Sequence, residues 1–212
     1  MTDEPRDHHR PVRRPADVFD RRFGSTDPAD VSRIAHATAS ALITRVRDEP
    51  ADDVVERLVS FTDAHGLETV AELWSHSPAK SLPGTLWRLY LLQLMVRDDA
   101  ATASLLYERG RAVLPSVDDV VAGAPTPAGP EELMTLVDEI LRGVFTGDFA
   151  VALERAASFC RVEAAGATDI ADDYDRSEPE RATAFTTRAL RLDTYAGDLT
   201  ACAGLWRRDA LT

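Results

Sequence analysis

Carboxylate and imidazole side chains recur at helical spacing in one stretch of the chain. Glu68, Glu72 and His76 are four residues apart, and His65 precedes them by about one turn. On a continuous helix these side chains would share one face, where their oxygens and nitrogens could bind a divalent metal. Helical di-metal proteins add a second Glu-x-x-His motif from another helix, and this sequence has none. The spacing therefore favours a solvated helix face.

A second candidate cluster is acidic. Asp169, Asp172, Asp173 and Asp175 lie within the segment ATDIADDYDR. Aspartates this close together can bind Mg²⁺ or Ca²⁺, but the order lacks the glycine and the glutamate of an EF-hand loop. The paired Glu-x-x-Glu and Glu-x-x-Asp motifs of helical pyrophosphohydrolases are also missing from the sequence. We therefore predict a solvated acidic loop over 167–176.

The other histidines and the two cysteines have simpler interpretations. His36 lies beside the apolar face of the first predicted helix, where we expect one satisfied hydrogen bond and no catalytic role. His8 and His9 are adjacent and could hold a transition metal only weakly. Cys160 and Cys202 fall within apolar helical patterns without CxxC spacing, so we expect two buried thiols and no disulfide.

Motifs of the common enzyme classes are missing from the sequence. There is no G-x-S-x-G nucleophile elbow, and no glycine loop of the P-loop or dinucleotide-binding type. Neither cysteine has a partner histidine that the sequence suggests. We therefore predict no catalytic, cofactor-binding or metal site, and the interpretation leans away from an enzyme.

Composition and charge narrow the function further. Hydrophobic residues make up 44% and charged residues 28% of the 212 residues, as in folded globular proteins. The net charge of −12, with Lys80 the only lysine, opposes binding to nucleic acid or anionic lipid, because such binding depends on cations. No run approaches the roughly 20 apolar residues of a membrane span. We expect a cytoplasmic protein.

The elements that would position these side chains are all predicted to be helices. Asp27, Pro28 and Asp30 supply an N-cap, a first-turn proline and a first-turn acid for the first helix. Ser177 and Glu180 form a capping box for a later one. Apolar residues at helical spacing predict further helices over 51–66, 67–74, 101–113, 130–144, 148–166, 177–192 and 199–206. Because no alternating β-branched run predicts a strand, the fold class is all-α, a helical bundle.

These helices are predicted to form one compact domain or two packed subdomains, preceded by a disordered arm. Residues 1–26 include RDHHRPVRR and form this mobile basic arm. Residues 27–121 form an N-terminal helical subdomain, 122–130 (AGAPTPAGP) a linker, and 131–212 a C-terminal helical subdomain. The segment LWRLYLLQLMV, residues 86–96, is apolar around its circumference, so we expect other helices to enclose it at the centre of the N-terminal subdomain.

One stretch resembles a known DNA-binding motif. The run HGLETVAELW, followed by SLPGTLWRLY, is similar to the helix-turn-helix of TetR-type repressors. The resemblance covers residues 66–96 and implies a DNA-binding regulator whose remaining helices bind a ligand and dimerise. It implies that the residues facing DNA are Thr69, Lys80, Ser81, Thr85, Arg88 and Tyr90.

Together these observations favour a non-catalytic protein-interaction or regulatory module. We expect a protein partner that docks on the basic arm, the acidic body or a groove between the subdomains, and a homodimer is the favoured oligomeric state. Aromatic residues that the core does not use would line such a groove, and the candidates are Trp87, Tyr90, Phe145 and Trp206. A TetR-like DNA-binding regulator and a metal-dependent helical hydrolase stay open as alternatives.

Overall fold

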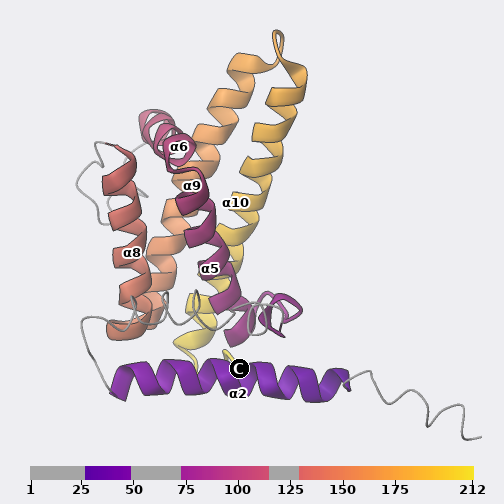
Figure 1. Cartoon of the computed structure of the whole chain (residues 1–212), viewed down its shortest axis with the longest axis vertical. Helices are drawn as coiled ribbons and strands as arrows, with labels where there is room; N and C mark the ends of the chain where they lie inside the picture. Colours follow the sequence, from indigo (N-terminus) through magenta and orange to yellow (C-terminus); the bar gives the residue numbers. More distant parts are fainter. Residues whose placement is uncertain (1–26, 49–72, 115–128) are drawn as a thin grey trace, which may run out of the picture.

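The structure, a computed structural model, describes residues 27–48, 73–114 and 129–212. Its helices are α2 (Pro28–Asp48), α5 (Leu82–Asp98), α6 (Ala100–Val113), α8 (Pro130–Thr146), α9 (Phe149–Tyr174) and α10 (Pro179–Trp206) (Figure 1). The described ranges contain no strand, which confirms the all-α prediction. The predicted basic arm, the helix predicted over 51–66 and most of the predicted linker lie outside these ranges. Within them, no helix is long and apolar enough to cross a bilayer.

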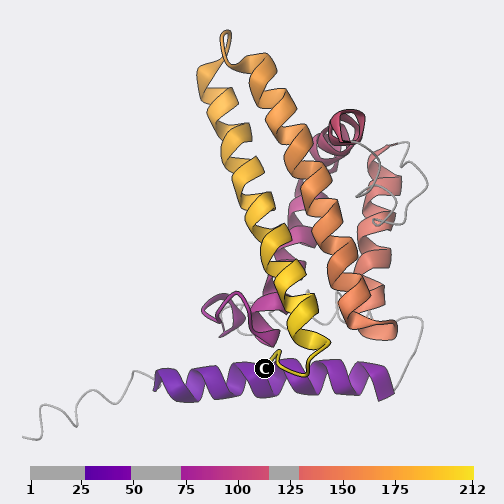
Figure 2. The same cartoon turned by 180° about the vertical axis from the view of Figure 1, so that it is seen from behind.

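Helix α9 lies at the centre of the bundle. It runs antiparallel beside α10, and the two form a long hairpin that projects beyond the other helices (Figures 1 and 2). Helices α6 and α8 pack on other sides of α9, and α2 lies crosswise at the end that holds the C-terminus (Figure 1). One core cluster extends from Ala35 in α2 to Leu211 after α10. Helices from both predicted subdomains therefore share this core.

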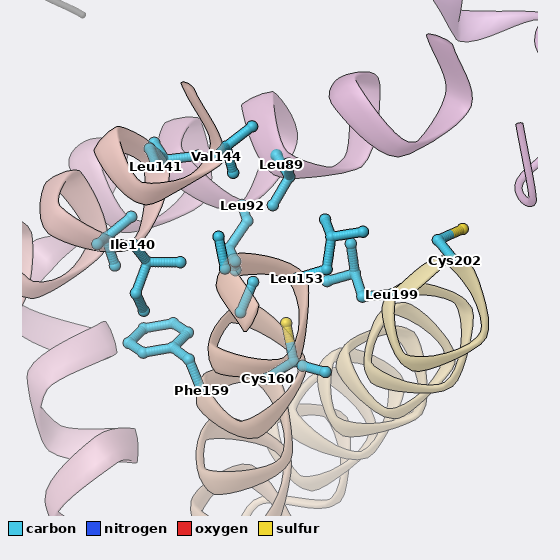
Figure 3. Close-up of a cluster of buried hydrophobic side chains, with 14 of the residues drawn as sticks. Leu89, Leu92, Ile140, Leu141, Val144, Leu153, Phe159, Cys160, Leu199 and Cys202 are labelled. Atoms are coloured by element: carbon cyan, nitrogen blue, oxygen red, sulfur yellow. The ribbon is translucent and has the colours of Figure 1, made fainter. Parts of the chain in front are cut away.

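Side chains from four helices meet in the part of the core drawn in Figure 3. Leu92 of α5, Ile140 of α8, Phe159 of α9 and Leu199 of α10 are each at most 1% exposed. Burying each such side chain contributes about 1.5–3 kcal/mol to folding. Both cysteines are buried and free, as predicted, with Cys160 inside this cluster.

Helices α2 and α9 begin at side-chain N-caps. Asp27 caps α2 by accepting a hydrogen bond from the backbone N–H of Ala29 at 2.9 Å. Asp148 caps α9 by accepting from the N–H of Val151, and the tight turn before it joins α8 and α9 into an αα-hairpin. A side-chain oxygen at the N-cap satisfies one of the N–H groups that the first helical turn leaves unpaired.

The predicted end of a helix at Gly166 is wrong, because α9 continues through this residue to Tyr174. Gly166 lies where α6 crosses α9, and a Cβ added to it would be 1.8 Å from the carbonyl oxygen of Leu106. Gly110 of α6 is its counterpart, since a Cβ there would be 1.9 Å from the carbonyl oxygen of Val162. The two glycines let the backbones touch, as small residues do at close helix crossings. The predicted acidic loop over 167–176 is therefore mostly the last two turns of α9.

Helix α10 also differs from its prediction. The capping box at Ser177 is wrong, because α10 begins at Pro179 after an N-cap residue, Glu178, that makes no side-chain capping bond. The helix continues without a break through Gly197, so the segments 177–192 and 199–206 are one element. Leu190 is 66% exposed although it is apolar, because the face that α10 buries includes Ala189 and Leu192.

The placement of the apolar segment 86–96 is a further correction. It belongs to α5, and within the described part of the chain this helix packs against α2, α6, α8 and α10 without being enclosed by them. The buried face carries Leu86, Leu89, Leu92 and Val96, whereas Leu94 on the opposite side is 47% exposed. Helix α9, with its many buried alanines, takes the central place because small side chains allow helices to approach on several sides.

Candidate functional site

The residues considered as possible metal ligands do not form a site in the described part of the chain. His76 is exposed in a turn, and His65, Glu68 and Glu72 lie outside the described residues. Within the ranges that the structure describes, no three His, Cys, Asp or Glu side chains come close enough together to hold a metal ion.

The acidic cluster at the end of α9 is partly used in an ion-pair network. Arg109 of α6 donates from Nε to Asp169 and from Nη2 to Asp173, both at 2.5 Å. These hydrogen bonds raise the pKa of Arg109 further above its ordinary value. Asp172 and Asp175 are exposed. The cluster therefore joins α6 to the last turns of α9, next to the glycine crossing.

His36 is half-buried and makes one contact. Its Nδ1 lies 2.7 Å from the carbonyl oxygen of Ser32, one turn earlier in α2. This is the single local hydrogen bond expected of a histidine at the edge of a core.

The residues that the TetR resemblance assigns to DNA have other contacts in this fold. Ser81 caps α5 by accepting from the N–H of Gly84, and the buried Thr85 hydroxyl donates to the Ser81 carbonyl at 2.7 Å. Arg88 pairs with Asp198 of α10 at 3.1 Å. Lys80 is exposed, and Thr69 lies outside the described residues.

A buried contact between a carboxyl group and a guanidinium was missed in the sequence. Glu163 of α9 is fully buried, and neither of its carboxylate oxygens accepts a hydrogen bond. Its nearest cation is Arg188 of α10, with Nη2 3.7 Å from Oε2. Burial raises the pKa of Glu163 well above its ordinary 4.5, and the charge of Arg188 only partly opposes this shift. The sequence pattern indicates the burial of Glu163, because this residue lies one turn after Phe159 and Cys160 on the apolar face of α9.

The outward face of α5 carries an apolar stripe, which we define as Trp87, Tyr90, Leu91 and Leu94. The spacing i, i+3, i+4, i+7 puts these four side chains on one face of the helix, opposite the buried one. The first three are half-buried, Leu94 is 47% exposed, and the rings of Trp87 and Tyr90 stack with centroids 5.5 Å apart. Trp87 also packs against the core with part of its surface, and the partly exposed apolar surface that remains is typical of a helix-binding face.

Polar contacts border the α5 stripe along both of its long edges. On the α10 side, Arg88 pairs with Asp198 and lies over the ring of Tyr195, 5.7 Å from its centroid. On the α8 side, Asp138 accepts from Gln93 at 3.0 Å and from Arg97 at 3.3 Å. These pairs neutralise one another, so the long edges of the stripe carry no net charge. An apolar centre with a polar rim is the usual anatomy of a protein interface.

Of the other candidate aromatic residues, Trp206 packs inward. Its ring lies 4.5 Å, between centroids, from that of the buried Phe149. The side chain of Phe145 lies outside the described part. The predicted aromatic residues that the structure brings together at a surface are therefore Trp87 and Tyr90.

Comparison with known proteins adds no assignment, since no protein-family model, curated protein or solved structure matches the chain. The site must be interpreted from its own chemistry. Its side chains are aromatic and aliphatic, and the charged residues along its two long edges are paired. Such a surface can bind an apolar face through burial and stacking.

Proposed function

We propose that this chain is a non-catalytic protein-interaction module whose α5 stripe binds an amphipathic helix of a partner. The observation that carries the proposal is the exposure of aromatic and aliphatic side chains at the spacing i, i+3, i+4, i+7. A partner helix with the same spacing would lay its apolar side chains along this stripe. Trp and Tyr are the residue types that most often dominate binding energy at protein interfaces.

The charges at the two ends of α5 define the partner further. Lys80 is exposed just before the helix, and Asp98 is exposed at its last turn, on the same face as Leu94. The partner helix should therefore carry an acidic residue at one end of its apolar stripe and a basic residue at the other.

Contacts inside the fold favour a protein partner over DNA. Thr85 is fully buried and Arg88 is held by Asp198, so two of the side chains needed for a TetR-like recognition helix are used within the bundle. Specific DNA binding would need such side chains to reach base edges, and a basic surface around them.

A photocrosslinking experiment tests the proposal. A benzophenone amino acid replaces Leu94 in the full chain, the cells are irradiated, and the attached peptide is sequenced by mass spectrometry. We expect peptides with apolar residues at helical spacing, and we expect Tyr90→Ala to reduce their yield about tenfold or more, as for a hot-spot residue.

The matched control places the same amino acid at Leu190, the most exposed large hydrophobic residue, which lies on α10. If position 94 yields no more crosslinked protein than position 190, or if the attached peptides have no apolar helical stripe, the proposal is wrong. Circular dichroism of each variant establishes that the bundle is folded.

A further inference from the structure

We infer that the helix that docks on the α5 stripe is α5 of a second copy, arranged antiparallel about a two-fold axis. This inference rests on the proposed function and names its partner. A two-fold interface uses the same patch on both chains, so the patch must be complementary to itself. The α5 stripe fulfils this condition, because it is apolar in the middle and oppositely charged at its two ends.

The charges at these ends select the antiparallel arrangement. Lys80 and Asp98 are exposed, and neither makes an ion pair within the described residues. Parallel pairing would set Lys80 against Lys80 and Asp98 against Asp98. Antiparallel pairing brings Lys80 of each copy toward Asp98 of the other, and it also opposes the two helix dipoles.

Nearby charges do not disturb this pattern. Asp99, next to Asp98, is engaged because its carboxylate accepts from the N–H of Thr102 and caps α6. Arg97 is held by Asp138 of α8. Among the described residues, the charges without an ion pair are thus Lys80 at one end of the stripe and the carboxylates of Asp98 and Asp99 at the other, and an antiparallel copy of the same helix matches them.

The apolar side chains pair in register in the same arrangement. With the two-fold axis between Tyr90 and Leu91, Trp87 of each copy faces Leu94 of the other. The most exposed aliphatic side chain of the stripe is thereby covered by its largest aromatic one. This is the pairing of anchor and pocket that interfaces concentrate near their centre.

The test is the mass of the full chain in solution, measured by light scattering and sedimentation equilibrium between about 1 and 200 μM. We expect the mass to rise with concentration from 23.2 kDa toward twice that value. Leu94→Glu should give a monomer at every concentration, whereas Leu190→Glu, on exposed α10, should leave dimerisation unchanged.

Charge reversal tests the orientation. Lys80→Glu and Asp98→Lys should each raise the dissociation constant about tenfold, because each creates two like-charge contacts per dimer. The double variant restores both contacts with the signs exchanged, so its dissociation constant should return to within about threefold of the original. A double variant that dimerises no better than either single variant would overturn the antiparallel arrangement.

Other outcomes separate this inference from the proposed function. In one outcome, the mass stays at 23.2 kDa at all concentrations while the crosslinker at position 94 captures an amphipathic helix of a different protein. This result would overturn the inference that the partner is a second copy, and it would support the proposed function. A dimer that Leu94→Glu does not disrupt overturns the inference, because its interface lies elsewhere.

Discussion

Replacing the buried glutamate of α9 by glutamine should stabilise the protein, and the gain should grow with pH. Glu163 is 0% exposed and accepts no hydrogen bond, so its charged form is poorly solvated in the folded state. Burial therefore raises its folded-state pKa well above 4.5, whereas in the unfolded chain it stays ordinary. Glu163→Gln keeps the shape of the neutral acid and removes the titration.

The magnitude follows from proton linkage. Between the unfolded and the folded pKa, the folded state keeps a proton that the unfolded state has lost, so stability falls as pH rises through this window. Each pH unit in the window costs about 1.4 kcal/mol. With an unfolded pKa of 4.5, the loss reaches at most about 3.5 kcal/mol by pH 7. Glu163→Gln should recover this amount at pH 7 and almost none of it at pH 4.5.

The assay is urea unfolding followed by circular dichroism at several pH values between 4.5 and 8, with extrapolation to water. Glu139→Gln, an exposed change on α8, is the matched control and should track the original protein at every pH. If the difference between Glu163→Gln and the original protein does not change with pH, or if the variant is less stable at pH 7, the reasoning is refuted. Glu163 would then be ionised in the folded state and stabilised by Arg188.

Three other experiments test separate features of the fold. Gly166→Ala should lower the free energy of unfolding by about 3 kcal/mol, because the added Cβ would overlap a carbonyl group of α6. Gly197→Ala should raise the free energy of unfolding by about 0.5–1 kcal/mol, because its Cβ would meet nothing within 4 Å. Thermal unfolding measures both changes. Arg109→Gln removes the ion pairs with Asp169 and Asp173, so the backbone amides in the last turns of α9 should exchange hydrogen for deuterium faster, as measured by mass spectrometry. An unchanged exchange rate would contradict the role of Arg109 in joining α6 to α9. Burial raises the pKa of both Cys160 and Cys202, so a thiol reagent at pH 8 should label them only after urea unfolding, and labelling of the native chain would contradict their burial.

The features that could be predicted from sequence are mainly local. The start of α2 depends on an N-cap and a first-turn proline, and both act within four residues of the helix start. The buried thiols were predictable because they lie at apolar positions of strongly periodic segments. The α5 stripe was predicted in part. Trp87 and Tyr90 were candidates for a partner-binding surface, but their helix was expected to be enclosed by other helices.

The features that could not be predicted depend on which helices are neighbours. Gly166 has the residue type of a helix end, and only the approach of α6 makes it a contact residue inside a helix. Leu190 has the residue type of the core, but the rotation of α10 against α9 leaves it outside. The continuous apolarity of α5 indicated burial on all sides, because periodicity reports composition around a helix and does not report how many neighbours that helix has.

The glycine crossing also has a consequence for the order of folding. Helices α9 and α10 are adjacent in sequence, so their contacts close a short loop and can form early. Helix α6 is distant from α9 in the sequence. The backbones that meet at Gly110 and Gly166 gain their contact energy only when they are in van der Waals contact. Docking of α6 is thus expected after the transition state, so a change at this crossing should chiefly speed unfolding and leave the folding rate almost unaltered.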